Sequence, residues 1–315
     1  MSITAFAPIS SGNFIIGFDI LGAAMKPVVG EPLGDWVSVE FASENSLRIS
    51  GPFREQLPAD PKQNIVWQCL HQFNEKLLQH GDKPKAVQLT LHKALPVGSG
   101  LGSSAASVVA AIKALNLFYD NALSNGELLI LAGELEGQIS GSIHYDNVAP
   151  SLLGGLQLMS HGEQKALALP TPPWHYLLLH PGTQLATKEA RAVLPKTIPL
   201  KQTTDVAMRL AGFVHHLHQS QFAEAAALLD DTLIEPHRAP LIPHFAEAQQ
   251  IAKANGALAY SISGAGPTSL AVCESRASAE KVQQALLQVY PGSEVKSWIC
   301  VIDEIGARES ERLGP

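Results

Sequence analysis

The chain has 315 residues, of which 46% are hydrophobic and 16% are charged, and its formal net charge is −7. Such a composition is typical of a globular protein with ample material for buried cores, and the length suits two domains or one large domain. The acidic balance argues against bulk binding to nucleic acid or to an anionic membrane, but it leaves room for an anionic small molecule.

No targeting or membrane-spanning segment is evident. The N-terminus lacks a basic stretch followed by a long apolar run, and no window reaches the roughly 18 apolar residues of a transmembrane helix. Cys69, Cys273 and Cys300 are widely spaced in apolar stretches without a C-x-x-C motif, which favours buried thiols over disulfides or a zinc site. We therefore expect a cytoplasmic protein with neither a membrane nor a nucleic-acid partner.

In the first half of the chain, strands and helices are mixed. Alternating apolar residues predict strands at 3–8, 35–41 and 86–92. Apolar residues at helical spacing predict a helix over 64–79, and the Ala-rich run 103–118 predicts a long helix. The first half of the chain is therefore expected to combine strands and helices.

A second helix in this half is signalled by a capping box. Ser124 and Glu127 have the required spacing, which predicts a helix running to about residue 138. The glycine-containing segment 137–150 then breaks it, and 155–159 is a predicted strand. Polar and then proline-rich residues follow, so we place a domain boundary near 165, giving domains 1–165 and 166–315.

The second half opens with a buried strand predicted at 174–181. Two strands flank the glycine loop 263–267, and the remaining apolar runs read as helices and a last strand. The helices are expected at about 203–219, 222–231, 243–254 and 278–290, and the strands at 257–262, 268–273 and 294–303. This order suggests an α+β sandwich with the helices on one face of a sheet.

A glycine- and serine-rich loop, PVGSGLGSSAAS at 96–107, joins a predicted strand to the helix at 103–118. Gly98, Gly100 and Gly102 give G-x-G-x-G, which is not the dinucleotide fingerprint, and Ser103 is not followed by the lysine of a Walker loop. The free N–H groups and positive end of such a helix can bind a phosphate, and glycines allow close approach. From the residues alone, a plain strand–helix connection capped by serine remains the alternative.

Three motifs in this chain resemble those of the GHMP kinases, the family named for its galactose, homoserine, mevalonate and phosphomevalonate enzymes. The loop PVGSGLGSSAAS is similar to the family's P-x-x-x-G-L-G-S-S-A phosphate loop. APISSGNFIIGFDILG (7–22) and SISGAGPTSLAV (261–272) resemble its first and third motifs. HYDNVAP (144–150) and TKEARAVLP (187–195) are similar to the family's homoserine-phosphorylating branch, so the resemblance covers nearly the whole chain.

This resemblance implies a two-domain fold, with an N-terminal ribosomal-protein-S5-like α/β domain and a C-terminal ferredoxin-like α+β domain. ATP would lie in the cleft between them with its phosphates against the loop formed by Pro96, Val97, Gly98, Ser99, Gly100, Leu101, Gly102, Ser103, Ser104, Ala105 and Ala106. Mg²⁺ prefers oxygen ligands. The resemblance suggests Ser104 and a glutamate from the next helix, and its spacing favours Glu136 over Glu134.

The acceptor implied by the resemblance is L-homoserine, whose phosphorylation gives O-phospho-L-homoserine for threonine biosynthesis. Arginine suits its carboxylate and aspartate suits its ammonium group. Arg191 and Arg238 match the family's substrate-binding arginines, and Asp19 fits the ammonium. The remaining acceptor-site residues implied by the resemblance are Asn13, His144, Asn147, Thr187 and Gly264.

The catalytic residues expected from this comparison are Ser104, Glu136, Asn147 and Arg191. Asn147 stands where several relatives have an aspartate base, and an amide cannot take a proton. Asp146 is adjacent, but side chains of neighbouring residues in an extended loop point in opposite directions. We therefore expect catalysis mainly by positioning and electrostatics.

The resemblance also implies a homodimer. Two alternatives stay open at this stage, namely a GHMP kinase for another small alcohol and a catalytically silent ATP-binding regulator. The intact loop glycines, Glu136 and the two arginines argue against the silent regulator.

Overall fold

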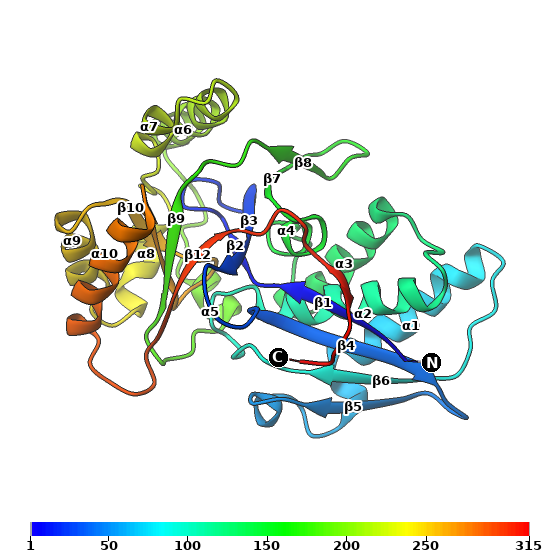
Figure 1. The fold of residues 1–315 in the computed structure, drawn as a ribbon. Helices are drawn as coiled ribbons and strands as arrows, with labels where there is room; N and C mark the ends of the chain where they lie inside the picture. Colours follow the sequence, from blue (N-terminus) through cyan, green and yellow to red (C-terminus); the bar gives the residue numbers. More distant parts are fainter. Residues whose placement is uncertain (1, 315) are drawn as a thin grey trace.

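The computed structural model describes residues 2–314, apart from the side chains of 139 and 140. It contains one five-stranded and one larger sheet, with helices packed against both (Figure 1). Within the described residues, no helix combines the length and apolar character needed to cross a lipid bilayer. The three cysteines are buried free thiols, which confirms that prediction.

The first sheet has the order β13-β1-β4-β6-β5, and only the β5–β6 pair is parallel. Its strands are β1 (Ser2–Pro8), β4 (Gly34–Phe41), β5 (Ser46–Ser50), β6 (Val87–His92) and β13 (Arg308–Ser310). In Figure 1 the last part of the chain returns to this sheet and ends beside it. The predicted strands at 3–8, 35–41 and 86–92 are confirmed.

Four helices lie on one side of this sheet (Figure 1). They are α1 (Ile65–Gln79), α2 (Ser103–Phe118), α3 (Asn125–Ser140) and α4 (Val148–Leu153). Asn64 caps α1 through the Val66 N–H, and Ser124 with Glu127 forms the predicted capping box of α3. The Ala- and Val-rich α2 packs against β1, β4, α1 and α3, so its small side chains are buried on nearly all sides.

The larger sheet combines strands from both halves of the chain, in the order β10-β11-β9-β12-β3-β7-β8, with β2 beside β3. Its strands are β2 (Ser10–Gly12), β3 (Leu21–Pro27), β7 (Leu156–Met159), β8 (Ala166–Leu169), β9 (His175–His180), β10 (Ala257–Ile262), β11 (Ser269–Cys273) and β12 (Lys296–Ile302). The segment expected as a boundary therefore contains β8, which pairs with β7. A division at residue 165 stays a prediction.

The remaining helices belong to the second half of the chain. They are α5 (Thr187–Ala192), α6 (Leu200–His218), α7 (Phe222–Ala227), α8 (Glu235–Arg238), α9 (Phe245–Ala254) and α10 (Arg276–Val289). Short 3₁₀ turns occur at Arg54–Gln56, Pro61–Gln63 and Ala239–Leu241. The helices expected at 203–219, 243–254 and 278–290 are confirmed, whereas the one expected over 222–231 ends at Ala227.

Helices of the second half cover both faces of the larger sheet, so the expected one-sided sandwich is wrong. Leu177 and Leu179 of β9 pack in the core formed with α9 and α10. Tyr176 and Leu178 point to the opposite face, where they pack in a core shared with Phe213 of α6. Because successive strand residues alternate between faces, a strand that is apolar throughout needs a cover on both sides.

Candidate active site

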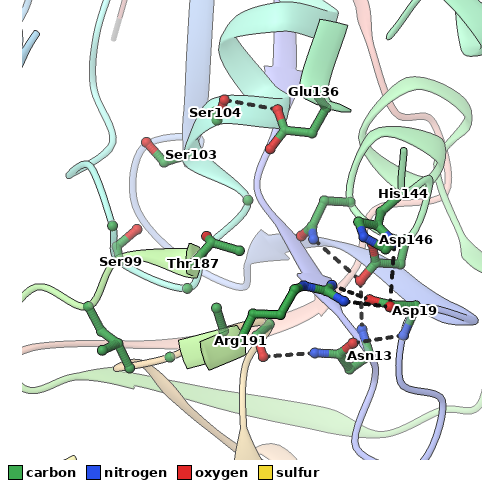
Figure 2. Close-up of a pocket in the computed structure, with 18 of the residues that line it drawn as sticks. Asn13, Asp19, Ser99, Ser103, Ser104, Glu136, His144, Asp146, Thr187 and Arg191 are labelled. Atoms are coloured by element: carbon green, nitrogen blue, oxygen red, sulfur yellow. Dashed lines mark hydrogen bonds and ion pairs between the residues drawn. The ribbon is translucent and has the colours of Figure 1, made fainter. Parts of the chain in front are cut away.

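A pocket lies where the loop before α2 meets the third glycine-rich motif and the segment after β2. It is lined by backbone and side chains from widely separated parts of the chain (Figure 2). Its lining comprises Asn13, Phe18, Asp19, Gly98, Ser99, Gly100, Gly102, Ser103, Ser104, Glu136, His144, Asp146, Asn147, Leu185, Thr187, Arg191, Arg238, Gly264, Ala265 and Gly266. Most of the residues expected at the site are therefore brought together.

The third motif anchors the loop at 98–102 through hydrogen bonds to the loop carbonyl groups. Thr268 donates its hydroxyl to the Ser99 carbonyl at 2.6 Å, and Ser263 donates its own to that of Gly100 at 2.7 Å. In a trans peptide the C=O and N–H bonds point in opposite directions. The N–H groups that follow these carbonyls therefore point away from Thr268 and Ser263, and they have no acceptor among residues 2–314. The third motif orients the loop amides for a ligand.

The first turn of α2 leaves its backbone donors unused. Gly102 precedes the helix with φ of 65°, a conformation that favours glycine, and no side chain among the described residues caps the helix. Ser99 adds a buried hydroxyl without a hydrogen-bond partner in the described part of the chain. Free amides, the positive end of a 16-residue helix and an unpartnered buried hydroxyl fit the phosphate groups of a nucleotide.

The Glu136 carboxylate lies beside the N-terminal end of α2. Ser104 donates its hydroxyl to Oε2 of Glu136 at 2.9 Å, and both residues line the pocket (Figure 2). Burial raises the pKa of Glu136, and the hydrogen bond from Ser104 partly opposes this shift. Glu134, two residues earlier on α3, is exposed and does not line the pocket.

This pair of oxygen donors suits Mg²⁺, which is held by a few protein oxygens together with phosphate oxygens and water. Among the described residues, no group of three or more His, Cys, Asp or Glu side chains could hold a metal on its own. Ser104 and Glu136 fit a nucleotide-bound Mg²⁺ whose remaining ligands are phosphate oxygens and water.

The segment after β2 makes a tight turn that presents Asn13 and Asp19 to the pocket. Asn13, Phe14 and Ile15 all have positive φ, at 66°, 36° and 69°. The Asn13 side chain donates to the Gly264 carbonyl at 2.8 Å and accepts the Asp19 N–H at 3.0 Å. These bonds stabilise a backbone conformation that L-residues rarely adopt.

Two arginines gather at the Asp19 end of the pocket. Arg191 of α5 donates two hydrogen bonds to the Asp19 carboxylate, at 2.8 and 3.1 Å (Figure 2). Arg238 is 2% exposed and donates to the carbonyls of Ala190 and Gly264. Both guanidinium groups lie close to the Phe18 ring, at 5.2 and 5.3 Å from its centroid, so cation–π attraction helps to hold two like charges together.

The positive charge of the two arginines at this end of the pocket is only partly neutralised by Asp19. Burial, followed by the nearby charge of Arg191, lowers the pKa of Arg238. The Nη2 group of Arg238 has no hydrogen-bond partner within the described residues. A small anion entering the pocket would find this donor free and would compete with Asp19 for Arg191.

Asp146 and Asn147 both face the pocket, which contradicts the expectation that their side chains point in opposite directions. The expected extended loop is in fact a turn leading into α4. Asn147 Nδ2 lies 3.5 Å from Asp146 Oδ2, which also accepts the Asn13 N–H at 3.2 Å. Burial, followed by repulsion from Asp19, raises the pKa of Asp146 to about 7.

The other expected residues divide between the pocket and the surrounding core. His144, Thr187 and Gly264 line the pocket. Pro96 and Val97 precede the lining part of the loop and do not face the pocket. Leu101, Ala105 and Ala106 are buried in the hydrophobic cores, where they anchor the loop and the start of α2.

A buried ion pair behind the loop was not anticipated. Lys93 Nζ lies 2.5 Å from Asp35 Oδ2 and also donates to the Ser103 carbonyl and the Ser107 hydroxyl. The two charged side chains are 2% and 0% exposed. The pair therefore links the ends of β4 and β6 to the first turn of α2, where the loop amides are presented.

The sequence profile for the GHMP kinases N terminal domain matches residues 64–155, and the profile for GHMP kinases C terminal matches 213–292. A homoserine kinase from Cytophaga hutchinsonii is 33% identical to this chain, with a TM-score of 0.88. The match covers 98% of this chain and 97% of that one.

More distant structures share the fold. A phosphomevalonate kinase from Streptococcus pneumoniae, solved with phosphomevalonate and AMPPNP, matches with a TM-score of 0.69 at 14% identity over 95% of this chain and 99% of that one. A mevalonate kinase from L. major, solved with R-mevalonate, matches with a TM-score of 0.63 at 16% identity over 96% and 95%. At these identities the likeness concerns the fold alone.

Proposed function

The chain belongs to the GHMP kinase family, and on that premise we propose that it is a homoserine kinase. It would transfer the γ-phosphoryl group of ATP to the hydroxyl of L-homoserine, giving O-phospho-L-homoserine and ADP. The observation that carries the proposal is the Asp19–Arg191–Arg238 cluster at one end of a pocket whose other end is the loop before α2. The similar homoserine kinase from Cytophaga hutchinsonii adds support.

The chemistry of this cluster matches a small zwitterion. Paired arginines suit a carboxylate because the planar guanidinium donates two parallel hydrogen bonds. Asp19 supplies the opposite charge for an ammonium group, and its N–H is tied to Asn13 so that the carboxylate is positioned in advance. Mevalonate carries a carboxylate but no ammonium, and shikimate likewise, so neither would use Asp19.

At the other end, phosphoryl transfer is a matter of alignment and of neutralising charge on the transferred group. The loop amides and Ser99 would bind the nucleotide phosphates, and Ser104 and Glu136 would hold Mg²⁺. When bound, Mg²⁺ neutralises developing negative charge on the phosphate oxygens. Arg191 would orient the acceptor, and Asn147 would hold its hydroxyl near the phosphate end. A homodimer in the cytoplasm and a role in threonine biosynthesis stay predictions.

The direct test is an acceptor screen. Purified protein is given ATP and Mg²⁺ with L-homoserine, mevalonate or shikimate in turn, and ADP release is measured. We expect ADP release that depends on L-homoserine and exceeds that with the other two acceptors by at least about a hundredfold, because the charged contact to Asp19 is lost without the amino group. Absence of ADP release with L-homoserine would overturn the proposal.

Glu136→Gln should raise the Mg²⁺ concentration needed for half-maximal activity by on the order of tenfold or more, because a charged metal ligand becomes a neutral one. Glu134→Gln is the matched control, since it removes an exposed carboxylate from the same helix. Titration of activity with Mg²⁺ at saturating ATP measures both. A larger effect at Glu134 than at Glu136 would contradict this assignment.

A further inference from the structure

We propose that Asp146 is the general base of the reaction, an inference that rests on the proposed kinase function. As the acceptor oxygen forms its bond to the γ-phosphorus, Asp146 takes the hydroxyl proton. The bond between the γ-phosphorus and the β–γ bridging oxygen breaks, and ADP keeps that electron pair. The proton then leaves Asp146 to solvent when the products depart, so charge and atoms balance.

The first support is the position of Asp146 between the two ends of the pocket. On one side, Asp146 Oδ2 accepts the Asn13 N–H, and Asn13 in turn accepts the Asp19 N–H. On the other side, Asn147 contacts both Asp146 and Ser10. Ser10 in turn lies against the loop before α2, because a Cβ added at Gly102 would lie 2.1 Å from the Ser10 hydroxyl oxygen. A substrate held at Asp19 and phosphorylated at the loop must pass its hydroxyl along this side of the pocket.

The second support is that the other carboxylates of the pocket are engaged elsewhere. Asp19 receives two hydrogen bonds from Arg191 and lies 3.4 Å from His144. Glu136 is hydrogen-bonded to Ser104 over the end of α2. Asp146 forms no ion pair with any cation in the described part of the chain, although Arg191 and Arg238 act on it at longer range.

The third support is energetic. A buried carboxylate without a counter-charge destabilises the folded state, so its presence at this position indicates a function for the charge. Asp146 is 5% exposed, and burying an unpaired charge disfavours its ionised form. The hydrogen bonds that Oδ2 accepts from Asn13 and Asn147 could equally go to the oxygen of an asparagine. Gly12 leaves room for this oxygen, since a Cβ there would lie 2.3 Å from it.

The titration of Asp146 fits the role of a base near neutral pH. Burial and repulsion from Asp19 raise its pKa to about 7, while the Asn13 N–H and Arg191 act in the opposite direction. His144, which also faces Asp19, has a pKa that burial lowers, while the charge of Asp19 acts in the opposite direction. The proton-accepting form of Asp146 is therefore populated above pH 7 and lost below it.

The test compares wild-type protein with Asp146→Asn over pH 5.5–8.5, at saturating ATP and homoserine. In the wild type we expect kcat to fall about tenfold per pH unit below about 7. In Asp146→Asn we expect kcat to be about 10²–10⁴-fold lower at pH 8 and to lose this acid limb, with KM for ATP unchanged. The control Asp82→Asn, which removes an exposed carboxylate, should behave as wild type.

A substrate-independent measurement accompanies the kinetics. In protein carrying ¹³C at the aspartate side-chain carboxyls, one resonance should titrate near pH 7 and be absent from Asp146→Asn, or from Asp146→Ser if the asparagine variant does not fold. A kcat within tenfold of wild type, a surviving acid limb, or no aspartate titrating near 7 would each overturn the assignment.

These outcomes are distinct from failure of the proposed function. If the wild type phosphorylates another alcohol but not homoserine, the substrate proposal fails and Asp146→Asn is tested on that alcohol. If it phosphorylates none of the alcohols offered, both proposals fall.

Discussion

Lys93→Met is expected to lower the free energy of unfolding by about 3–5 kcal/mol. Methionine fills much of the space of the lysine stem, but it leaves the Asp35 carboxylate buried at 0% exposure without its counter-charge. Two further acceptors, the Ser103 carbonyl and the Ser107 hydroxyl, also lose the donor from Nζ. Urea denaturation followed by circular dichroism measures the change.

The matched control is Lys281→Met, which removes an exposed lysine from α10 and should change the free energy of unfolding by less than about 0.5 kcal/mol. The double variant Lys93→Met/Asp35→Asn should regain at least half of the loss. Asparagine can still accept the N–H groups of Ala94 and Leu95, which Asp35 Oδ1 accepts now, and no charge is left buried. A double variant no more stable than Lys93→Met alone would contradict this explanation.

Local signals allowed much of the fold to be predicted. The apolar run and serine start of α2 were sufficient to place that helix at 103–118, and the Ser124/Glu127 capping box placed the start of α3. The seven-residue strand β3 is not predicted because its residues, LGAAMKP, have little strand propensity. Its glycine is required for packing, since a Cβ at Gly22 would lie 1.7 Å from the Asp146 carbonyl oxygen.

Site features that depend on pairing between distant residues could not be read from the sequence. Asp35 and Lys93 are neighbours because Trp36 pairs with His92 across β4 and β6, and no local pattern specifies that register. The clearest available signal was a charged residue flanking each of two apolar strands. The sequence predicts an extended loop at Asp146, but a turn into α4, which no local pattern specifies, brings Asp146 and Asn147 to the same pocket.

The two arginines of the pocket differ in what a substrate must displace. Arg191 already donates both of its terminal nitrogens to Asp19, so a carboxylate that binds there exchanges one ion pair for another. Arg238 is held by two backbone carbonyls, and its Nη2 has no partner within residues 2–314. A substrate carboxylate therefore gains more from Arg238 than from Arg191, although both are charged donors at similar distances from Phe18.

Arg238→Met is accordingly expected to raise KM for homoserine by about 10²–10³-fold, equivalent to roughly 2.7–4.1 kcal/mol, because a buried charge-assisted contact is lost. Arg191→Met should raise it by only about 10–10²-fold, since the released Asp19 carboxylate becomes free to hold the substrate ammonium. Steady-state kinetics at saturating ATP measure both values, and KM for ATP should stay within about twofold of wild type in each variant.

Arg209→Met, at a partly exposed arginine on α6, is the control and should change neither constant. A wild-type KM for homoserine in either pocket variant would remove that arginine from the carboxylate site. An effect at Arg191 larger than at Arg238 would show that the Asp19 pair is not exchanged on binding.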